Sequence, residues 1–208
     1  MPDMEDNKIT ERESLQIIQQ MIQTAKNEQK DNGVSWIIWG WLLFAVSVLT
    51  YFNLHFTWFE DRYVFWNYFG ILTLLMLCFS VVKYFFSPKT GKADTYTSAI
   101  FRKLNVGFFI VIMLVIIAMN RNLPAILGFT IMIGLYGFWM LIYGTLINFK
   151  PSVVAAFITW AIAFASLYLS NDLATVMLFH AAAILCGYII PGHIAYYEFR
   201  KINTPAMA

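Results

Sequence analysis

Histidine carries the strongest chemistry within the apolar parts of this sequence. The chain has three histidines, and His180 lies inside a long apolar run near the C-terminus. Imidazole is a common axial ligand of haem iron, so His180 and His55, at the end of the first apolar run, form a candidate haem-ligand pair. The other interpretation is a histidine hydrogen-bonded to a neighbouring helix. The sequence favours this second interpretation, because no further haem-binding pattern accompanies the pair, and we expect no cofactor and no metal.

A second group of polar residues points to solute transport. Asn67, Asn105 and His180 fall within apolar runs and would line a polar path for a small neutral or apolar solute. Polar residues of this kind also join helices through hydrogen bonds, worth about 0.6 kcal/mol on average. Ion-coupled carriers typically need a carboxylate within the membrane, and here every Asp and Glu lies at an end of an apolar run or outside it. The sequence therefore favours interhelical hydrogen bonds over a transport path.

Known catalytic patterns are missing from the sequence. It contains no His-Glu-x-x-His helix for zinc, no Gly-x-Ser-x-Gly nucleophile turn and no glycine-rich phosphate loop. Cys78 and Cys186 both lie in apolar runs and show no metal-ligand spacing. The net charge of +2 provides no concentrated basic face for nucleic acid. We therefore predict a non-enzymatic protein that does not bind nucleic acid.

The apolar runs predict an all-α membrane protein. Of the 208 residues, 60% are hydrophobic and 12% are charged, whereas soluble domains carry about 25% charge. Runs of about 20 apolar residues cross a bilayer as helices, because the backbone must satisfy its own hydrogen bonds in lipid. Small residues within the last three runs predict close helix contacts, namely Gly134, Gly137, Gly144, Ala161, Ala165, Ala183 and Gly187. Residues 34–197 are predicted to form a bundle of six transmembrane helices, arranged as three antiparallel hairpins, at 34–56, 63–86, 100–119, 124–147, 152–170 and 173–195.

The distribution of basic residues predicts the orientation of this bundle. Only Arg62 and Arg121, among the 14 lysines and arginines, fall in the connections on one side. All the others lie in the N-terminal segment, the second and fourth connections, and the tail at 198–208. Because basic loops stay in the cytoplasm, we expect both termini to be cytoplasmic. Within the last span, Pro191 and Gly192 are predicted to kink the helix.

The cytoplasmic segment at 1–33 is predicted to form an amphipathic helix at about 10–31. Thr10 and Glu13 match a capping box at its start. Its opposite face is mostly glutamine rather than lysine and arginine, which indicates packing against protein rather than an anionic membrane surface. That protein is the end of the chain's own bundle, a second copy, or a partner. The apolar face consists of Leu15, Ile18, Met21, Ile22 and Ala25.

Four short motifs are similar to a group of uncharacterised integral membrane proteins from Bacteroidota. They are Glu-Ser-Leu-Gln-Ile-Ile at 13–18, Asp31-Asn32-Gly33, Trp39-Gly40-Trp41 and Ile190-Pro191-Gly192-His193. The resemblance covers nearly the whole chain and implies a multi-pass protein of the bacterial inner membrane in a signalling context. It implies no activity, cofactor or catalytic residue.

These expectations combine into one function and two alternatives. The sequence predicts a non-enzymatic membrane protein that lies in the lipid bilayer and has a partner-binding or regulatory cytoplasmic face. The first alternative is a transporter or channel for a small neutral or apolar solute. The second is a haem-binding redox protein.

Overall fold

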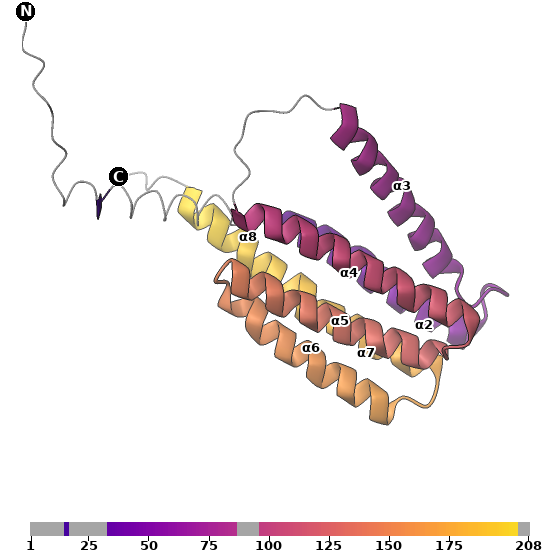
Figure 1. Ribbon diagram of the computed structural model, residues 1–208. Coiled ribbons are helices and arrows are strands. Elements are labelled where there is room, and N and C mark those ends of the chain that lie inside the picture. The colour runs from indigo at the N-terminus through magenta and orange to yellow at the C-terminus, as the bar shows by residue number, and fades with distance from the viewer. Residues whose placement is uncertain (1–14, 17–32, 87–95, 204–208) are drawn as a thin grey trace, which may run out of the picture.

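Every regular element in the described chain is a helix. A computed structural model describes residues 15–16, 33–86 and 96–203 (Figure 1). The helices are α2 (Val34–Phe56), α3 (Val64–Phe86), α4 (Tyr96–Arg121), α5 (Ala125–Leu146), α6 (Lys150–Leu169), α7 (Leu173–Ile184), the π-helical segment η1 (Leu185–Ile189) and α8 (Ile190–Asn203). The prediction of an all-helical fold is confirmed for this part of the chain, and α2, α3, α5 and α6 begin and end within two residues of the predicted spans.

Five described helical segments have the length and apolar composition to cross a membrane. They are Val34–Phe56, Lys103–Arg121, Ala125–Leu146, Lys150–Leu169 and Leu173–Lys201. A further apolar segment in α3, Val64–Met76, is shorter. These segments have the character of an α-helical membrane bundle.

The exterior and the interior of the bundle differ in the way that lipid surroundings require. Large apolar side chains point outward along whole helices, including Ile110 and Leu114 on α4 and Phe157 and Phe164 on α6, all of them more than half exposed. Soluble monomers rarely expose an apolar surface of this extent. Small polar side chains are instead fully buried, among them Ser47, Thr50, Ser152, Thr159 and Ser166. The fold therefore supports the prediction of a membrane location.

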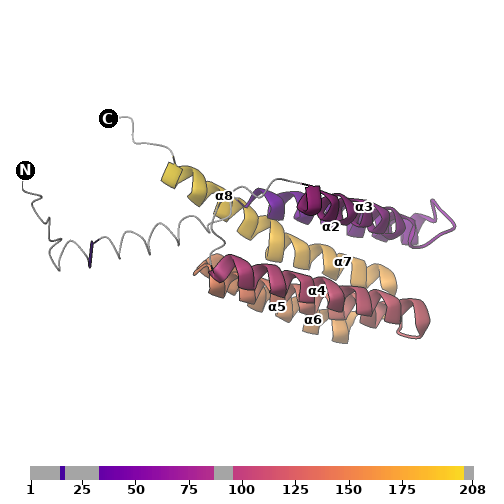
Figure 2. The same cartoon turned by 45° about the horizontal axis from the view of Figure 1, so that its top comes forward.

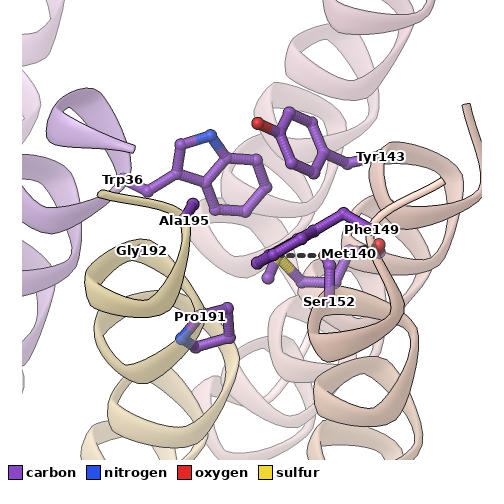
Figure 3. A pocket seen from close by; sticks show the side chains of 8 residues that line it. All are labelled: Trp36, Met140, Tyr143, Phe149, Ser152, Pro191, Gly192 and Ala195. Carbon is purple, nitrogen blue, oxygen red and sulfur yellow. Dashed lines mark hydrogen bonds between the residues drawn. The ribbon is translucent and has the colours of Figure 1, made fainter. Parts of the chain in front are cut away.

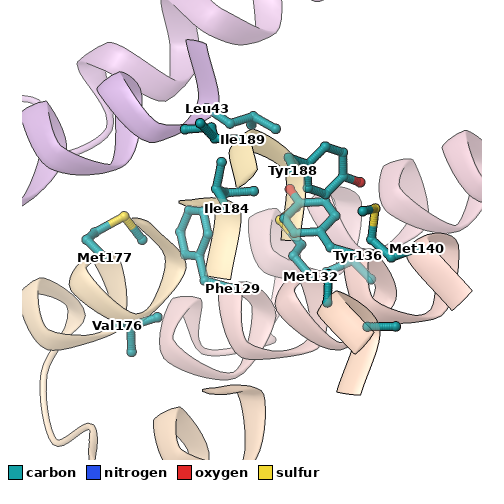
Figure 4. Close-up of a cluster of buried hydrophobic side chains, with 13 residues drawn as sticks. Leu43, Phe129, Met132, Tyr136, Met140, Val176, Met177, Ile184, Tyr188 and Ile189 are labelled. Atoms are coloured by element: carbon teal, nitrogen blue, oxygen red, sulfur yellow. The ribbon is translucent and has the colours of Figure 1, made fainter. Parts of the chain in front are cut away.

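Helix α7 lies at the centre of the bundle. It packs against α2 on one side and against α5 and α6 on the other, with α4 on the outside of α5 (Figure 2). The backbone of α3 comes close only to that of α2 among the described helices, and α3 diverges from the other helices in Figure 1. The main core lies where α2, α5, α7 and η1 meet, and it includes Leu43, Phe129, Tyr136, Met177 and Ile184 (Figure 4).

Glycines allow the closest approaches between helices. A Cβ atom at Gly137 would lie 2.7 Å from the Trp160 ring of α6, and one at Gly40 would lie 2.8 Å from Ile189 of η1. Gly144 and Gly187 also face the neighbouring helix closely. Gly134 differs from the expectation, because a Cβ there would meet no atom within 4 Å. Its carbonyl oxygen instead accepts a hydrogen bond from Nε1 of Trp160 at 2.9 Å, and Ala161, a second exception, is exposed.

The last predicted span contains a π-helical turn rather than a break. Helix continues from Leu173 to Asn203, well beyond the predicted end at residue 195. Pro191 has no N–H to donate to the carbonyl of Gly187, and its ring would clash with that carbonyl in a regular α-helix. The extra residue of η1 relieves this conflict, and the N–H of Ile190 bonds to the carbonyl of Leu185. The distortion predicted at Pro191 therefore lies one turn before it.

Two glycines on α5 provide a matched test of this packing. We expect Gly137→Ala to lower the free energy of unfolding by about 1–3 kcal/mol, because its methyl group would overlap Trp160 and the backbone of α6. Gly134→Ala has open space around it and should raise stability by about 0.5–1 kcal/mol through lower chain entropy. Thermal unfolding in detergent micelles compares the two variants. Equal effects would contradict this assignment of the α5–α6 contact.

Candidate functional site

A stripe of small and polar residues on α2 faces α7. Gly40, Leu43, Ser47, Thr50 and Asn53 are the buried residues of α2. Their spacing of three and four residues places them on one side of the helix. The packing between α2 and α7 brings Ser47 opposite His180, and both side chains have no exposed surface. This contact joins two fully buried polar side chains of different helices.

The hydrogen bonds around Ser47 define the protonation of His180. Oγ of Ser47 donates its proton to the carbonyl oxygen of Leu43 at 2.7 Å. The same Oγ lies 2.8 Å from Nδ1 of His180. A hydroxyl group has one proton, so when Oγ donates it to Leu43, Oγ accepts here and Nδ1 of His180 donates. His180 is therefore assigned as the tautomer with its proton on Nδ1 and a bare lone pair on Nε2.

Three aromatic rings surround the imidazole of His180. The ring centroids of Trp66, Tyr136 and Phe129 lie 5.3 Å, 5.4 Å and 5.9 Å from it, and all three contacts are edge-to-face. Nε2 of His180 is buried without a hydrogen-bond partner, and so is Nε1 of Trp66. The site thus combines an unpaired acceptor and an unpaired donor inside an aromatic enclosure. Such groups bind a hydrogen-bonding ligand, accept a proton or ligate a metal.

The structure does not bring the two proposed haem ligands together. His180 pairs with Ser47, whereas His55 lies eight residues further along α2, a rise of about 12 Å. The His55 side chain is exposed and packs against Tyr51 and Phe56 at ring-centroid distances of 6.2 Å and 5.1 Å. Two axial ligands must face each other across one iron atom. The arrangement of His180 matches the interhelical hydrogen bond rather than the haem pair.

The three residues of the predicted polar path also lie apart. Asn67 is exposed in the first turn of α3, and its Nδ2 donates to Oδ2 of Asp61 at 2.7 Å. Asp61 is held in turn by Asn53, whose Nδ2 donates to the Asp61 carbonyl at 3.0 Å. The Asn67 side chain therefore binds the α2–α3 loop and does not line an interior path. Asn105 is half-buried on α4, which does not pack against α3 or α7 within the described residues.

A small pocket lies at the end of the bundle where α2 begins. Trp36 of α2, Tyr143 of α5 and Phe149 surround it, with Pro191, Gly192 and Ala195 of α8 on the other side (Figure 3). Oγ of Ser152 donates to the carbonyl of Met140 at 2.9 Å at its base. The space inside does not admit a water-sized molecule. This pocket is a packing junction of four helices, α2, α5, α6 and α8, rather than a ligand site.

Most of the predicted partner-binding face lies outside the described residues. Ile18, Met21, Ile22 and Ala25 belong to the segment that the structure does not describe. Leu15 is described, lies in a helical turn with Gln16, and is 59% exposed. The prediction for this face stays a prediction.

The sequence interpretation missed the residues that complete the site around His180. In the sequence, Ser47 and Trp66 stand within apolar runs, and no motif distinguishes them. One signal was available, since small and polar residues recur along α2 at three- and four-residue spacing from Gly40 to Asn53. That pattern predicts a polar helix interface. Nothing in the sequence indicates that α7, rather than another helix, lies against it.

Comparison of the chain with protein-family models, with curated proteins and with solved structures yields no match.

Removal of the Ser47 hydroxyl tests the contact with His180. We expect Ser47→Ala to lower the free energy of unfolding by about 1–3 kcal/mol, because it leaves the Nδ1 proton of His180 buried without an acceptor. Thr50→Val is the matched control, since Thr50 is equally buried but bonds only to Val46 of its own helix. It should cost about 0.5 kcal/mol. Thermal unfolding in detergent measures both variants, and a Ser47→Ala variant as stable as wild type would contradict the assigned hydrogen bond.

Proposed function

We propose that this chain is a non-enzymatic, six-span protein of a bacterial inner membrane that acts by binding a protein at its cytoplasmic face. The bound protein is a regulatory partner or a second copy of the chain. In this proposal both termini are cytoplasmic, and the predicted helix at 10–31 is the main binding element. The observation that carries the proposal is the closed core, which concentrates the bundle's polar groups in contacts between its own helices.

The closed core supports binding over solute transport. Ser47 of α2 and His180 of α7 are hydrogen-bonded to each other. The hydroxyl oxygens of Thr130 on α5 and Ser166 on α6 are 3.1 Å apart. All four side chains are buried. A transport path needs water-accessible polar groups across the hydrocarbon region. These four side chains of the described interior instead contact one another across neighbouring helices.

The junction at Gly33 supports a shared cytoplasmic surface. Gly33 begins α2 with a φ of 70°, a left-handed conformation that favours glycine. A Cβ atom there would lie 2.5 Å from the carbonyl oxygen of Gly192 and 3.0 Å from the backbone nitrogen of Tyr196. The N-terminal segment therefore joins the bundle directly beside α8. In the proposed orientation, both segments belong to one cytoplasmic surface.

Helix α8 has the composition expected of a segment that leaves the membrane. Tyr197 is 73% exposed, and Arg200 lies 5.9 Å from the ring centroid of Tyr196. Tyrosine, arginine and lysine are favoured at the membrane–water interface on the cytoplasmic side. The exposed end of α8 thus provides polar and aromatic side chains on the helix that contacts Gly33. This surface is suited to protein binding.

Charge substitutions on the two faces of the N-terminal helix test the proposed binding element. We expect Ile18→Glu with Ile22→Glu to abolish crosslinked partners in native membranes, because charge on the apolar face opposes its burial. Gln16→Glu with Gln20→Glu adds the same charge to the opposite face and should leave the partners unchanged. Crosslinking followed by mass spectrometry identifies the partners in both variants. The same partners in both variants and in a chain lacking residues 1–30 would refute the proposal.

Cysteine labelling tests the closed core and the orientation together. In a background with Cys78→Ala and Cys186→Ala, a membrane-impermeant maleimide should label Glu60→Cys only from outside the cell and Lys150→Cys only in inside-out vesicles. Glu60 is exposed in the loop between α2 and α3, and Lys150 is exposed at the start of α6. Ser47→Cys should resist labelling from both sides, because its position is fully buried. Rapid labelling of Ser47→Cys would instead support a water-filled path.

A further inference from the structure

Two unpaired nitrogen atoms lie on facing rings inside the bundle. Nε2 of His180 is an acceptor with a bare lone pair, since Ser47 accepts the proton of the other ring nitrogen. Nε1 of Trp66 always carries a proton and acts only as a donor. Both atoms are buried without a hydrogen-bond partner, which destabilises the folded chain. Native structures rarely leave such groups unpaired unless a water or a ligand completes them.

We propose that this site binds a single hydroxyl group, which accepts a hydrogen bond from Nε1 of Trp66 and donates one to Nε2 of His180. A hydroxyl oxygen performs both roles at once, whereas a carbonyl group cannot donate to Nε2. The two nitrogens belong to rings in direct edge-to-face contact, with centroids 5.3 Å apart. Their complementary hydrogen-bonding roles match one bridging oxygen.

The bound hydroxyl would hold α3 against the core. Trp66 is on α3, whose backbone approaches only that of α2 among the described helices, and His180 is on the central helix α7. The Trp66 ring also contacts Phe129 of α5, with centroids 4.9 Å apart. Together with Phe69, Trp66 thus connects α3 to the core. Occupancy of the site couples the position of α3 to the binding of a hydroxyl-bearing molecule.

Two sources supply the same hydroxyl chemistry. A water molecule has a second proton that needs a further acceptor, for which the faces of the neighbouring aromatic rings are available. An aliphatic alcohol from the bilayer uses its one proton on His180, and its chain extends among apolar side chains. Both sources place an oxygen between the same two nitrogens. The response of the Nε2 resonance to added 1-octanol distinguishes water from an alcohol.

Nitrogen NMR of the His180 ring tests the proposal directly. The full-length protein with His55→Asn and His193→Asn keeps His180 as its one histidine, and it is labelled with ¹⁵N-histidine in phospholipid nanodiscs. We expect the ¹⁵N resonance of Nε2 to be shifted from the position of an unprotonated nitrogen with a free lone pair, because Nε2 accepts a hydrogen bond. The Nδ1 resonance reports the Ser47 contact in the same spectrum, so it shows that the fold is intact. This protein retains Trp66, so its spectrum tests the proposal even if a Trp66 variant does not fold.

Substitution of Trp66 and addition of an alcohol identify the bound group. Trp66→Phe should move Nε2 toward the free lone-pair position and leave Nδ1 unchanged, whereas Trp58→Phe, at an exposed position, should change neither resonance. Magnetisation transfer from water to Nε2, insensitive to added 1-octanol, would identify bound water. A hydrogen-bonded Nε2 that appears only with 1-octanol would identify an alcohol site. A free Nε2 resonance in lipid and with 1-octanol would overturn the proposal.

Discussion

The structure depends on one buried imidazole that has to be hydrogen-bonded. An unpaired polar group within an apolar bundle costs more than most packing contacts contribute, so His180 requires an acceptor for its Nδ1 proton. Ser47 provides that acceptor from α2 and passes its own proton to the carbonyl of Leu43. This relay sets the rotation of α2 and α7 about their axes. Gly40 on the same face of α2 then lies against Ile189, where a larger side chain would not fit.

The second constraint is the proline near the end of the last long helix. Because Pro191 cannot continue a regular hydrogen-bond ladder, the chain inserts the π-helical turn of η1 before it. The helix then continues as α8 and presents the backbone of Gly192 to Gly33 at the start of α2. The same continuous helix therefore contributes His180 to the core and Gly192 to the contact with Gly33. The core and this end of the bundle are connected by continuous helix.

The distribution of polarity separates the interior from the ends of the molecule. Lipid-facing surfaces of α4 and α6 carry bulky apolar side chains, and the interior concentrates serine, threonine and histidine between helices. Interior groups of this kind act on one another, which agrees with a binding role at the bundle's ends better than with solute passage. The Trp66 and His180 nitrogens are the exception, because their hydrogen-bonding capacity is left open inside the core. They form the interior location best suited to a small ligand.

The sequence by itself determined the helical fold and most helix ends, because length, hydrophobicity and loop residues act locally. The start and end of α2 and α5, for example, follow from apolar runs bounded by glycine, proline and polar residues. It also identified His180 as the exceptional polar residue of the interior. Only the tertiary structure decided that Ser47 accepts its proton, that Trp66 shares its enclosure, and that His55, Asn67 and Asn105 lie elsewhere. Hydrophobic periodicity defines which face of a helix is buried, but the neighbour of that face is chosen by packing between segments far apart in the chain.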